Sequence, residues 1–132
     1  MKQPVWIKES DALAIHERVL AEHGGPSGVR DRSLLLSALA RPQQHFAYAS
    51  KPSIPEMAAL YTAGVVRNHP FVDGNKRTGF VLGVLFLELN GYRFTATEEA
   101  ATQAILDLAA GKIRENALTA WITENAKTKR RR

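Results

Sequence analysis

The sequence contains no cysteine, and this absence excludes several kinds of protein chemistry. Without a thiol, the chain can form neither a disulfide framework nor a thiolate nucleophile, and a zinc site built on cysteine is excluded as well. A chain without disulfides fits a reducing, intracellular compartment.

Long hydrophobic runs are also missing. The longest apolar stretch, residues 80–89, is about half as long as a membrane span and contains Glu88. Residues 1–6 lack the apolar run of a signal peptide. We therefore expect a soluble, cytoplasmic protein.

The sequence has fewer acidic than basic residues. It contains 13 Asp and Glu and 18 Lys and Arg, which gives a net charge of +5. This excess predicts a polyanionic partner: a nucleic acid, a nucleotide or an acidic protein. Much of it lies in residues 127–132, which we interpret as a basic disordered tail after a single domain of residues 1–126. Aromatic residues are not interleaved with a basic stripe, so direct nucleic-acid binding is not expected.

Apolar residues recur at helical spacing along nearly the whole chain and predict an all-α bundle of about six helices. The expected helices cover residues 11–22, 31–40, 53–68, 75–89, 98–110 and 115–126. The fourth is apolar nearly all round, which predicts a buried central helix. Residues 41–52 contain two prolines and predict a loop, with a short extended piece at 46–49.

The most informative segment lies before the central helix and reads His69-Pro70-Phe71-Val72-Asp73-Gly74-Asn75-Lys76-Arg77. His69 offers a general base, and Asp73 is a hard carboxylate suited to Mg²⁺. Gly74 permits a left-handed backbone, and the last three residues begin a helix whose free N–H groups attract anions. A base, a metal carboxylate and an anion cradle are the parts that phosphoryl transfer needs.

Single residues in this run also have ordinary structural explanations. Asp73 or Asn75 alone could be the N-cap of the following helix, and Lys76 and Arg77 alone could be a solvated face. The spacing excludes a P-loop, and no cluster of His or Cys supplies a zinc site. Only the conjunction of these groups within one short run favours phosphate chemistry.

The run resembles the signature of the Fic/Doc family, His-Pro-Phe-x-Asp/Glu-Gly-Asn-x-Arg, position by position. The similarity extends to residues 28–43 upstream and to residues 85–92 at the end of the predicted central helix. It implies a Fic/Doc-type helical bundle that transfers a phosphate-containing group from a nucleotide to a protein.

Two departures place the chain within that family. Members that transfer AMP usually have Gly where this chain has Lys76, and a second Arg where it has Phe80. Both departures are typical of the Doc (death-on-curing) branch, the toxins of prokaryotic toxin–antitoxin systems. The resemblance therefore implies a kinase that passes the γ-phosphate of ATP to a Ser or Thr hydroxyl and inhibits translation, with elongation factor Tu as the known type of target.

Carried onto this sequence, the resemblance makes His69 the general base and Asp73 the Mg²⁺ ligand. It places the next four residues around the phosphates: Gly74, Asn75, Lys76 and Arg77. Arg67 resembles a basic residue that the Doc branch has at this position, which makes it a candidate phosphate contact, although it could equally be a surface arginine. Phe71 is expected to anchor the loop in the core.

By position, residues 43–52 correspond to the family's flap, which aligns the target by strand addition. His45, Phe46 and Tyr48 would be candidates for target contact there, although core packing also explains the aromatic residues. His16 and His23 are predicted to be structural.

The inhibitory pattern of many Fic proteins, Ser/Thr-x-x-x-Glu-Gly/Asn, does not occur in this sequence. Inhibition is therefore expected in trans, from a cognate antitoxin of the prevent-host-death type or similar, whose segment folds on binding. Two other functions stay open: an AMP (nucleotidyl) transferase of the same fold, and a non-enzymatic basic interaction module.

Overall fold

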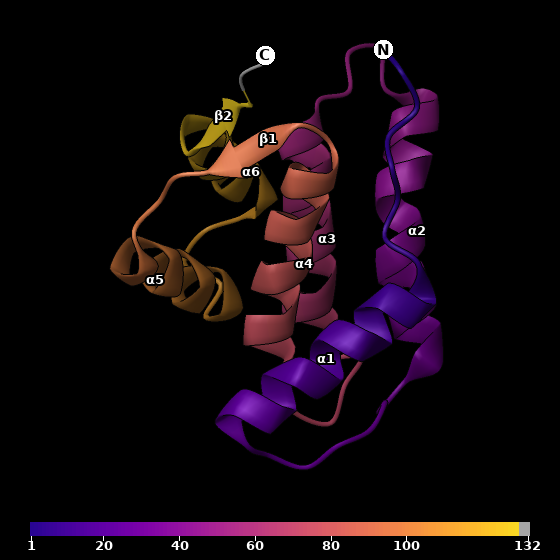
Figure 1. Cartoon of the computed structure of the whole chain (residues 1–132), viewed down its shortest axis with the longest axis vertical. Coiled ribbons are helices and arrows are strands. Elements are labelled where there is room, and N and C mark those ends of the chain that lie inside the picture. The colour runs from indigo at the N-terminus through magenta and orange to yellow at the C-terminus, as the bar shows by residue number, and fades with distance from the viewer. Residues whose placement is uncertain (130–132) are drawn as a thin grey trace.

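The computed structural model describes residues 1–129, which form six helices and two short strands (Figure 1). In chain order the elements are α1 (Glu9–His23), α2 (Arg32–Tyr48), α3 (Ile54–Asn68), α4 (Asn75–Leu89), β1 (Tyr92–Phe94), α5 (Glu98–Ala109), α6 (Glu115–Glu124) and β2 (Ala126–Thr128). The prediction of a helical bundle of about six helices is confirmed. No helix in the described part is long and apolar enough to cross a membrane.

Helices α3 and α4 form the centre of the molecule, and two glycines of α4 let them approach closely. A Cβ atom added at Gly79 would lie 2.9 Å from a methyl group of Val66, and one at Gly83 would overlap the Thr62 hydroxyl. That hydroxyl donates a hydrogen bond to the carbonyl of Gly79 at 2.8 Å. The close contact fixes the end of α3 relative to the start of α4, which is where the site lies.

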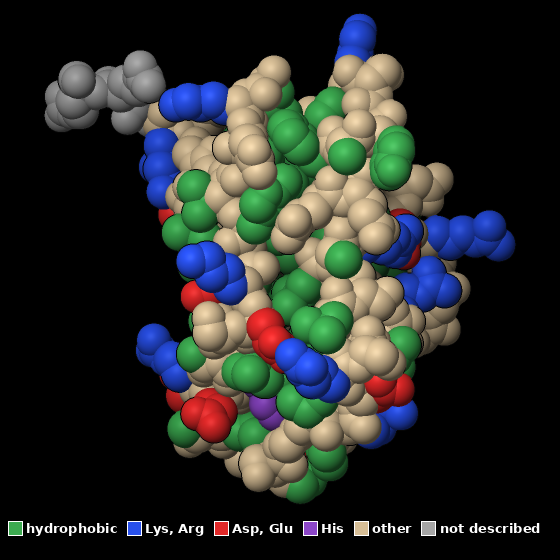
Figure 2. All heavy atoms as spheres, turned by 90° about the vertical axis from the view of Figure 1, so that its right-hand side faces the viewer, with side chains coloured by type: hydrophobic (Ala, Val, Ile, Leu, Met, Phe, Trp, Pro, Cys, Tyr) green, Lys and Arg blue, Asp and Glu red, His purple; other side chains and the backbone are tan. Residues whose placement is uncertain are grey.

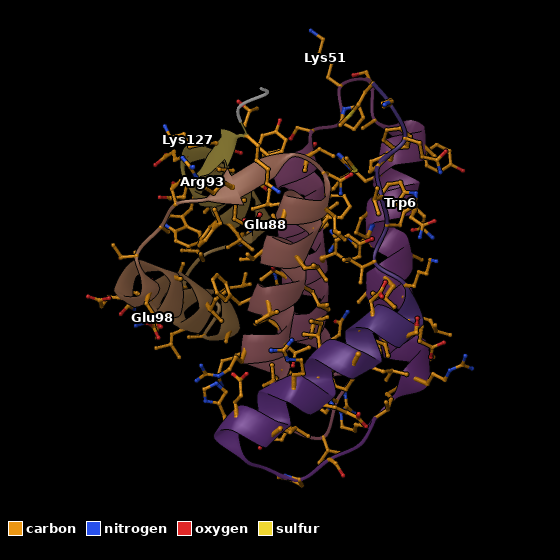
Figure 3. The ribbon with its side chains drawn as sticks, in the orientation of Figure 1. Trp6, Lys51, Glu88, Arg93, Glu98 and Lys127 are labelled. Carbon is orange, nitrogen blue, oxygen red and sulfur yellow. The ribbon has the colours of Figure 1, made fainter. Side chains whose placement is uncertain are left out.

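The other helices cover this central pair from two sides: α1 and α2 lie on one side, α5 and α6 on the other (Figure 1). The segment before α1 runs along α2 and carries Trp6 (Figure 3). The Trp6 ring stacks on Phe86 of α4 with ring centroids 5.9 Å apart. Tyr61 of α3 is fully buried and accepts a hydrogen bond from the Ile7 N–H at 3.1 Å. Its burial raises the pKa of Tyr61 to about 12.

Capping residues fix several helix ends as the sequence predicts. The hydroxyl oxygens of Ser53 and Thr97 accept hydrogen bonds from backbone N–H groups in the first turns of α3 and α5. Helix α1 begins at Glu9, two residues before the predicted start at residue 11, and the Asp11 carboxylate accepts the N–H of Lys8 at 2.9 Å.

Helix α2 is longer than predicted. It continues through Pro42 to Tyr48, so residues 41–48 of the predicted loop are helical instead, including residues 46–48 of its predicted extended piece. Pro42 is buried, and packing offsets the hydrogen bond that its missing N–H cannot make. Contacts with distant helices also hold this half of α2, since Arg41 pairs with Glu115 of α6.

The C-terminal strand corrects the predicted start of the tail. β2 pairs antiparallel with β1, and Lys127 lies opposite Arg93 in that ribbon (Figure 3). Lys129 pairs with Glu88 of α4 at 3.1 Å. Residues 127–129 are therefore ordered against the domain, while residues 130–132 of the predicted tail lie outside the described residues.

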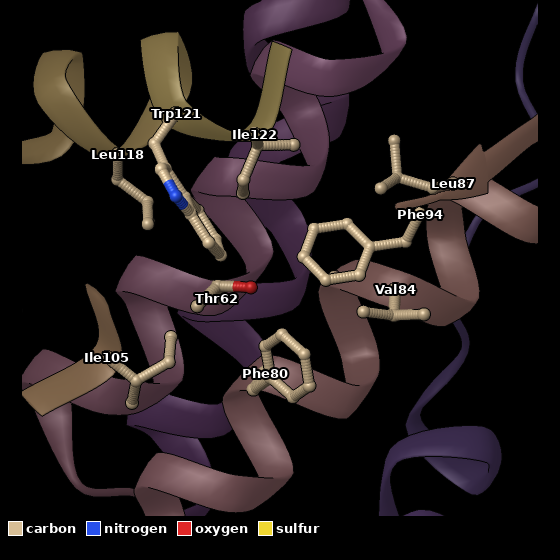
Figure 4. A pocket seen from close by; sticks show the side chains of 10 residues that line it. Thr62, Phe80, Val84, Leu87, Phe94, Ile105, Leu118, Trp121 and Ile122 are labelled. Atoms are coloured by element: carbon tan, nitrogen blue, oxygen red, sulfur yellow. The ribbon is translucent and has the colours of Figure 1, made fainter. Parts of the chain in front are cut away.

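A small closed cavity lies between α3, α4, β1, α5 and α6 (Figure 4). Its volume is about 10 Å³, and its walls are apolar apart from Thr62, whose hydroxyl is already bonded. Such a space is at the lower limit for a single water molecule, so it belongs to the core rather than to a ligand site.

Candidate active site

The loop between α3 and α4 is shaped by two left-handed residues. His69 ends α3 with φ 51° and ψ 58°, and Gly74 precedes α4 with φ 78°. A left-handed residue is common after a helix, but it is costly for a side chain other than Gly or Asn. The conformation of His69 therefore has to be held by its surroundings.

The side chain of Asn75 closes this loop into a ring. Its Oδ1 accepts the N–H of Phe71 at 3.0 Å, and its Nδ2 donates to the carbonyl of Phe71 at 2.9 Å. Asn75 is 7% exposed, so both bonds lie within the protein. The buried amide thus satisfies two backbone groups that helices and strands leave without partners.

His16 of α1 supports the loop from the core. It is 3% exposed, and its ring stacks on Phe71 with centroids 3.8 Å apart and an interplanar angle of 9°. Its Nε2 lies 2.8 Å from the carbonyl oxygen of Asp73, which can only accept, so Nε2 is the donor. Phe71 is fully buried. One side chain thus contacts both the anchor of the loop and the backbone of the predicted metal ligand.

Residues 24–31 lie along the outer side of the loop. Val29 and Phe71 form an isolated antiparallel bridge, and the N–H groups of Arg30 and Asp31 both donate to the carbonyl of Pro70. Hydrogen bonds from Ser33 and the Leu34 N–H lower the pKa of the Asp31 carboxyl, which also caps α2.

The extended segment beside the site is therefore residues 24–31, not the predicted flap at residues 43–52. Residues 43–48 are part of α2, where His45 pairs with Glu56 at 2.8 Å and Phe46 packs edge-on against Trp6. Tyr48 is 88% exposed at the end of that helix. These contacts leave the predicted flap without an extended strand.

Asp73 is exposed on the loop, and its carboxylate fills the space in front of Gly25, where an added Cβ atom would overlap it. No group of three or more His, Asp and Glu side chains that could enclose a metal exists among residues 1–129. Mg²⁺ needs no such cage, since one carboxylate, phosphate oxygens and water are its usual ligands. The exposed Asp73 carboxylate therefore fits Mg²⁺ brought by a nucleotide.

A cleft of about 670 Å³ opens beside the loop, within the size range of small-molecule sites. Six of the predicted site residues line it: His69, Asp73, Gly74, Asn75, Lys76 and Arg77. A second wall comes from α5, where Glu98 (labelled in Figure 3), Thr102 and Leu106 face the space. Arg67 is exposed near the end of α3 and does not belong to the lining.

The first turn of α4 presents unused donors to this cleft. None of the backbone hydrogen bonds found in residues 1–129 uses the N–H of Gly74, Asn75, Lys76 or Arg77. Lys76 and Arg77 are exposed and form no ion pair with an acidic side chain of the described chain. Free N–H groups, the positive end of a helix and two unpaired cations together favour an anionic ligand.

The sequence does not predict that Arg30 and His16 hold the loop between α3 and α4. Arg30 donates from its side chain to the end of α3, but its place in the sequence gives no sign of that contact. His16 does carry a signal, because it is a polar residue on the apolar face of α1. Such a residue needs a buried partner, and here the partner is the loop.

Comparison with known protein families agrees with the family resemblance of the sequence. The model described as the Fic/DOC family matches residues 6–87, more than half of the chain. The chain belongs to the Fic/DOC family. Within this family, it is 30% identical over 95 residues to the protein named Protein kinase doc of Escherichia phage P1, an alignment that covers 72% of this chain and 75% of the relative. It is 40% identical over 74 residues to Toxin Doc of Mycolicibacterium smegmatis, covering 55% of this chain and 57% of that relative.

Proposed function

We propose that this Fic/DOC protein is a Doc-type kinase that transfers the γ-phosphate of ATP to a Ser or Thr hydroxyl of a protein. The observation that carries the proposal is that His69, Asp73 and the unpaired cations of α4 line the same cleft. Membership of the family and the names of the two relatives agree with it.

His69 is the proposed general base. It is exposed on the rim of the cleft, where a hydroxyl group of another protein has access to it. Base catalysis of this kind typically contributes about 10²–10⁴-fold to a rate. His69 would take the proton of the target hydroxyl as the oxygen attacks the γ-phosphorus and ADP leaves.

Asp73 is the proposed ligand of Mg²⁺, which when bound would neutralise charge on the phosphates. The phosphates themselves would lie against the backbone of Gly74 and the side chains of Lys76 and Arg77. Asn75 would contribute its N–H, because its side chain is occupied by the loop. The cleft gives no support to a phosphate contact of Arg67.

Lys76 and Phe80 support phosphate transfer over AMP transfer. Both line the cleft, so each occupies space next to a bound nucleotide. A Gly at position 76 would let a phosphate chain approach the backbone, whereas the Lys side chain fills that space and adds a charge. An apolar ring at position 80 offers no charge to a second phosphate-binding point. We infer that the nucleotide presents its γ-phosphate, not its α-phosphate, to the target.

The cellular role that fits this chemistry is that of a toxin held by a cognate antitoxin. One relative is named a toxin, and a basic chain is suited to an acidic partner that binds in trans. We propose elongation factor Tu, or a similar translation factor, as the target, with arrest of translation as the result.

The test is a transfer assay with the full chain, Mg²⁺, elongation factor Tu and ATP labelled at either the α or the γ position. We expect label on the target from γ-labelled ATP only, and none with His69→Ala. The matched control is His45→Ala, which removes a histidine outside the cleft and should retain transfer. Transfer of the α label would instead identify an AMP transferase.

The non-enzymatic module has less support. On the face shown in Figure 2, Lys and Arg side chains are scattered among acidic and apolar ones and form no continuous basic stripe. If His69→Ala arrested growth as strongly as the wild type, this module would replace the kinase as the proposed function.

A further inference from the structure

The peptide bond between Asp73 and Gly74 is held at one end only. Its carbonyl oxygen accepts a hydrogen bond from His16 Nε2 at 2.8 Å, toward the core. At its other end, the Gly74 N–H is used by no backbone hydrogen bond in residues 1–129. The orientation of this peptide therefore depends on the contact with His16.

The planarity of the peptide bond determines where the Gly74 N–H points once the Asp73 carbonyl is fixed. The chain contains no cis peptide bond in its described part. In a planar trans peptide the N–H points opposite to the carbonyl. Because the Asp73 carbonyl faces the buried His16, the Gly74 N–H faces away from the core, on the side where Gly74 lines the cleft.

Without this contact the peptide would be free to turn. Gly74 has no side chain to restrict it, and glycine populates left-handed and right-handed backbone about equally. A turned peptide would aim the Asp73 carbonyl oxygen at the cleft. An oxygen with partial negative charge would then face the phosphates in place of a donor.

We propose that His16 is a positioning residue that locks the Asp73–Gly74 peptide, so that the Gly74 N–H binds a phosphate oxygen of the nucleotide in the cleft. This inference rests on the proposed kinase function. His16 itself touches no substrate: it is buried and lies outside the lining of the cleft. The His16 ring stacks on Phe71 at an interplanar angle of 9°, and this stacking keeps Nε2 within hydrogen-bond distance of the Asp73 carbonyl.

Two substitutions separate the hydrogen bond from the packing. His16→Phe keeps an aromatic ring that can stack on Phe71 but removes the donor. His16→Gln loses the stacking but restores a donor at a similar reach. Thermal unfolding of both variants reports on the fold. Because either variant alone could lower stability, the comparison between them is what isolates the donor.

The measurement is an amide NMR titration of the full, ¹⁵N-labelled chain with ATP and Mg²⁺, followed by kinase kinetics. In the wild type we expect the Gly74 amide proton to move downfield as ATP binds. In His16→Phe that shift should disappear, while α5 amides at the other wall still respond. Loss of one bond to a charged phosphate should weaken ATP binding roughly ten- to hundredfold. His16→Gln should recover most of the shift and of the affinity.

The outcomes are distinguishable. If no residue of the wild-type cleft responds to ATP, the proposed function is wrong, and this inference with it. If His16→Phe retains both the Gly74 shift and the wild-type affinity, only the positioning role is wrong. If both variants lose the response of the whole cleft together with their native spectra, His16 is merely structural and the inference is overturned.

Discussion

Arg30 donates from Nε to the carbonyl oxygen of His69 at 2.7 Å and from Nη2 to that of Asn68 at 2.9 Å. Both carbonyls belong to the end of α3, where helical partners are missing. The guanidinium therefore satisfies this helix end and holds His69 in its left-handed conformation. Arg30 thus acts on the proposed base through the backbone.

Arg30→Ala is expected to lower phosphate transfer about tenfold or more while leaving the fold intact, because a small misplacement of a reacting group is costly. Arg32→Ala is the matched control: Arg32 is also exposed and also makes two hydrogen bonds, but to Glu9, the first residue of α1. That exposed surface pair should contribute little to stability and should leave phosphate transfer unchanged. Equal activity losses in both variants would contradict the positioning of His69 by Arg30.

Asn75→Ala should both destabilise the protein and remove activity. The substitution leaves the buried N–H and carbonyl of Phe71 without partners, at a cost of about 1–3 kcal/mol. Urea unfolding measures this loss. Asn116→Ala, at an exposed asparagine in the first turn of α6, should change stability by less than about 0.5 kcal/mol. A fully stable, active Asn75→Ala variant would show that the loop does not need the two hydrogen bonds between the Asn75 side chain and Phe71.

Gly83→Ala should be destabilising even though alanine favours helices. The added methyl group would overlap the Thr62 hydroxyl and lie 3.1 Å from the carbonyl oxygen of Ala58. Overpacking of this kind costs about 1–3 kcal/mol, more than the roughly 1 kcal/mol that alanine gains over glycine in a helix. Leu89→Ala, at an exposed position of the same helix, provides the control in urea unfolding. A more stable Gly83→Ala would mean that α3 and α4 can separate without cost.

The raised pKa of Tyr61 leads us to expect that the free energy of unfolding falls in alkaline solution. Burial raises its pKa to about 12, above the ordinary value of 10.0. Between these values the unfolded chain releases the phenolic proton while the folded chain retains it. Stability is therefore fully present below pH 10 and falls as the pH rises toward 12, by roughly 3 kcal/mol at most. Unfolding measured at two alkaline pH values should show a steeper fall for the wild type than for Tyr61→Phe, and equal slopes would contradict this.

Local signals made much of the fold predictable from the sequence. Ser53 and Thr97 are residue types that commonly cap helices, and α3 and α5 begin directly after them. The sequence predicts that α2 ends at residue 40, because proline normally ends a helix and Pro42 follows shortly after. Two long-range features stabilise the longer helix: the burial of Pro42 and the pair of Arg41 with Glu115 of α6. A single sequence does not show such a contact.

The site was predictable to the same extent. The base, the carboxylate and the cations lie within one short run, so their proximity follows from the chain itself. The side chains that hold this run do not: His16 is 57 positions from Asp73, and Arg30 is 39 positions from His69. Their contacts depend on how α1 and residues 24–31 fold back, which periodicity and capping do not specify.

The position of α5 also affects how the protein is made. Helix α5 supplies a wall of the cleft, yet it is synthesised after residues 69–77. A nascent chain that has not emerged from the ribosome beyond Thr97 contains the proposed base and the proposed phosphate-binding turn, but lacks the α5 wall of the cleft. A premature stop codon in this interval would yield a fragment in the same incomplete state. If the proposed function holds, the chain would therefore become competent for transfer only after α5 has been synthesised.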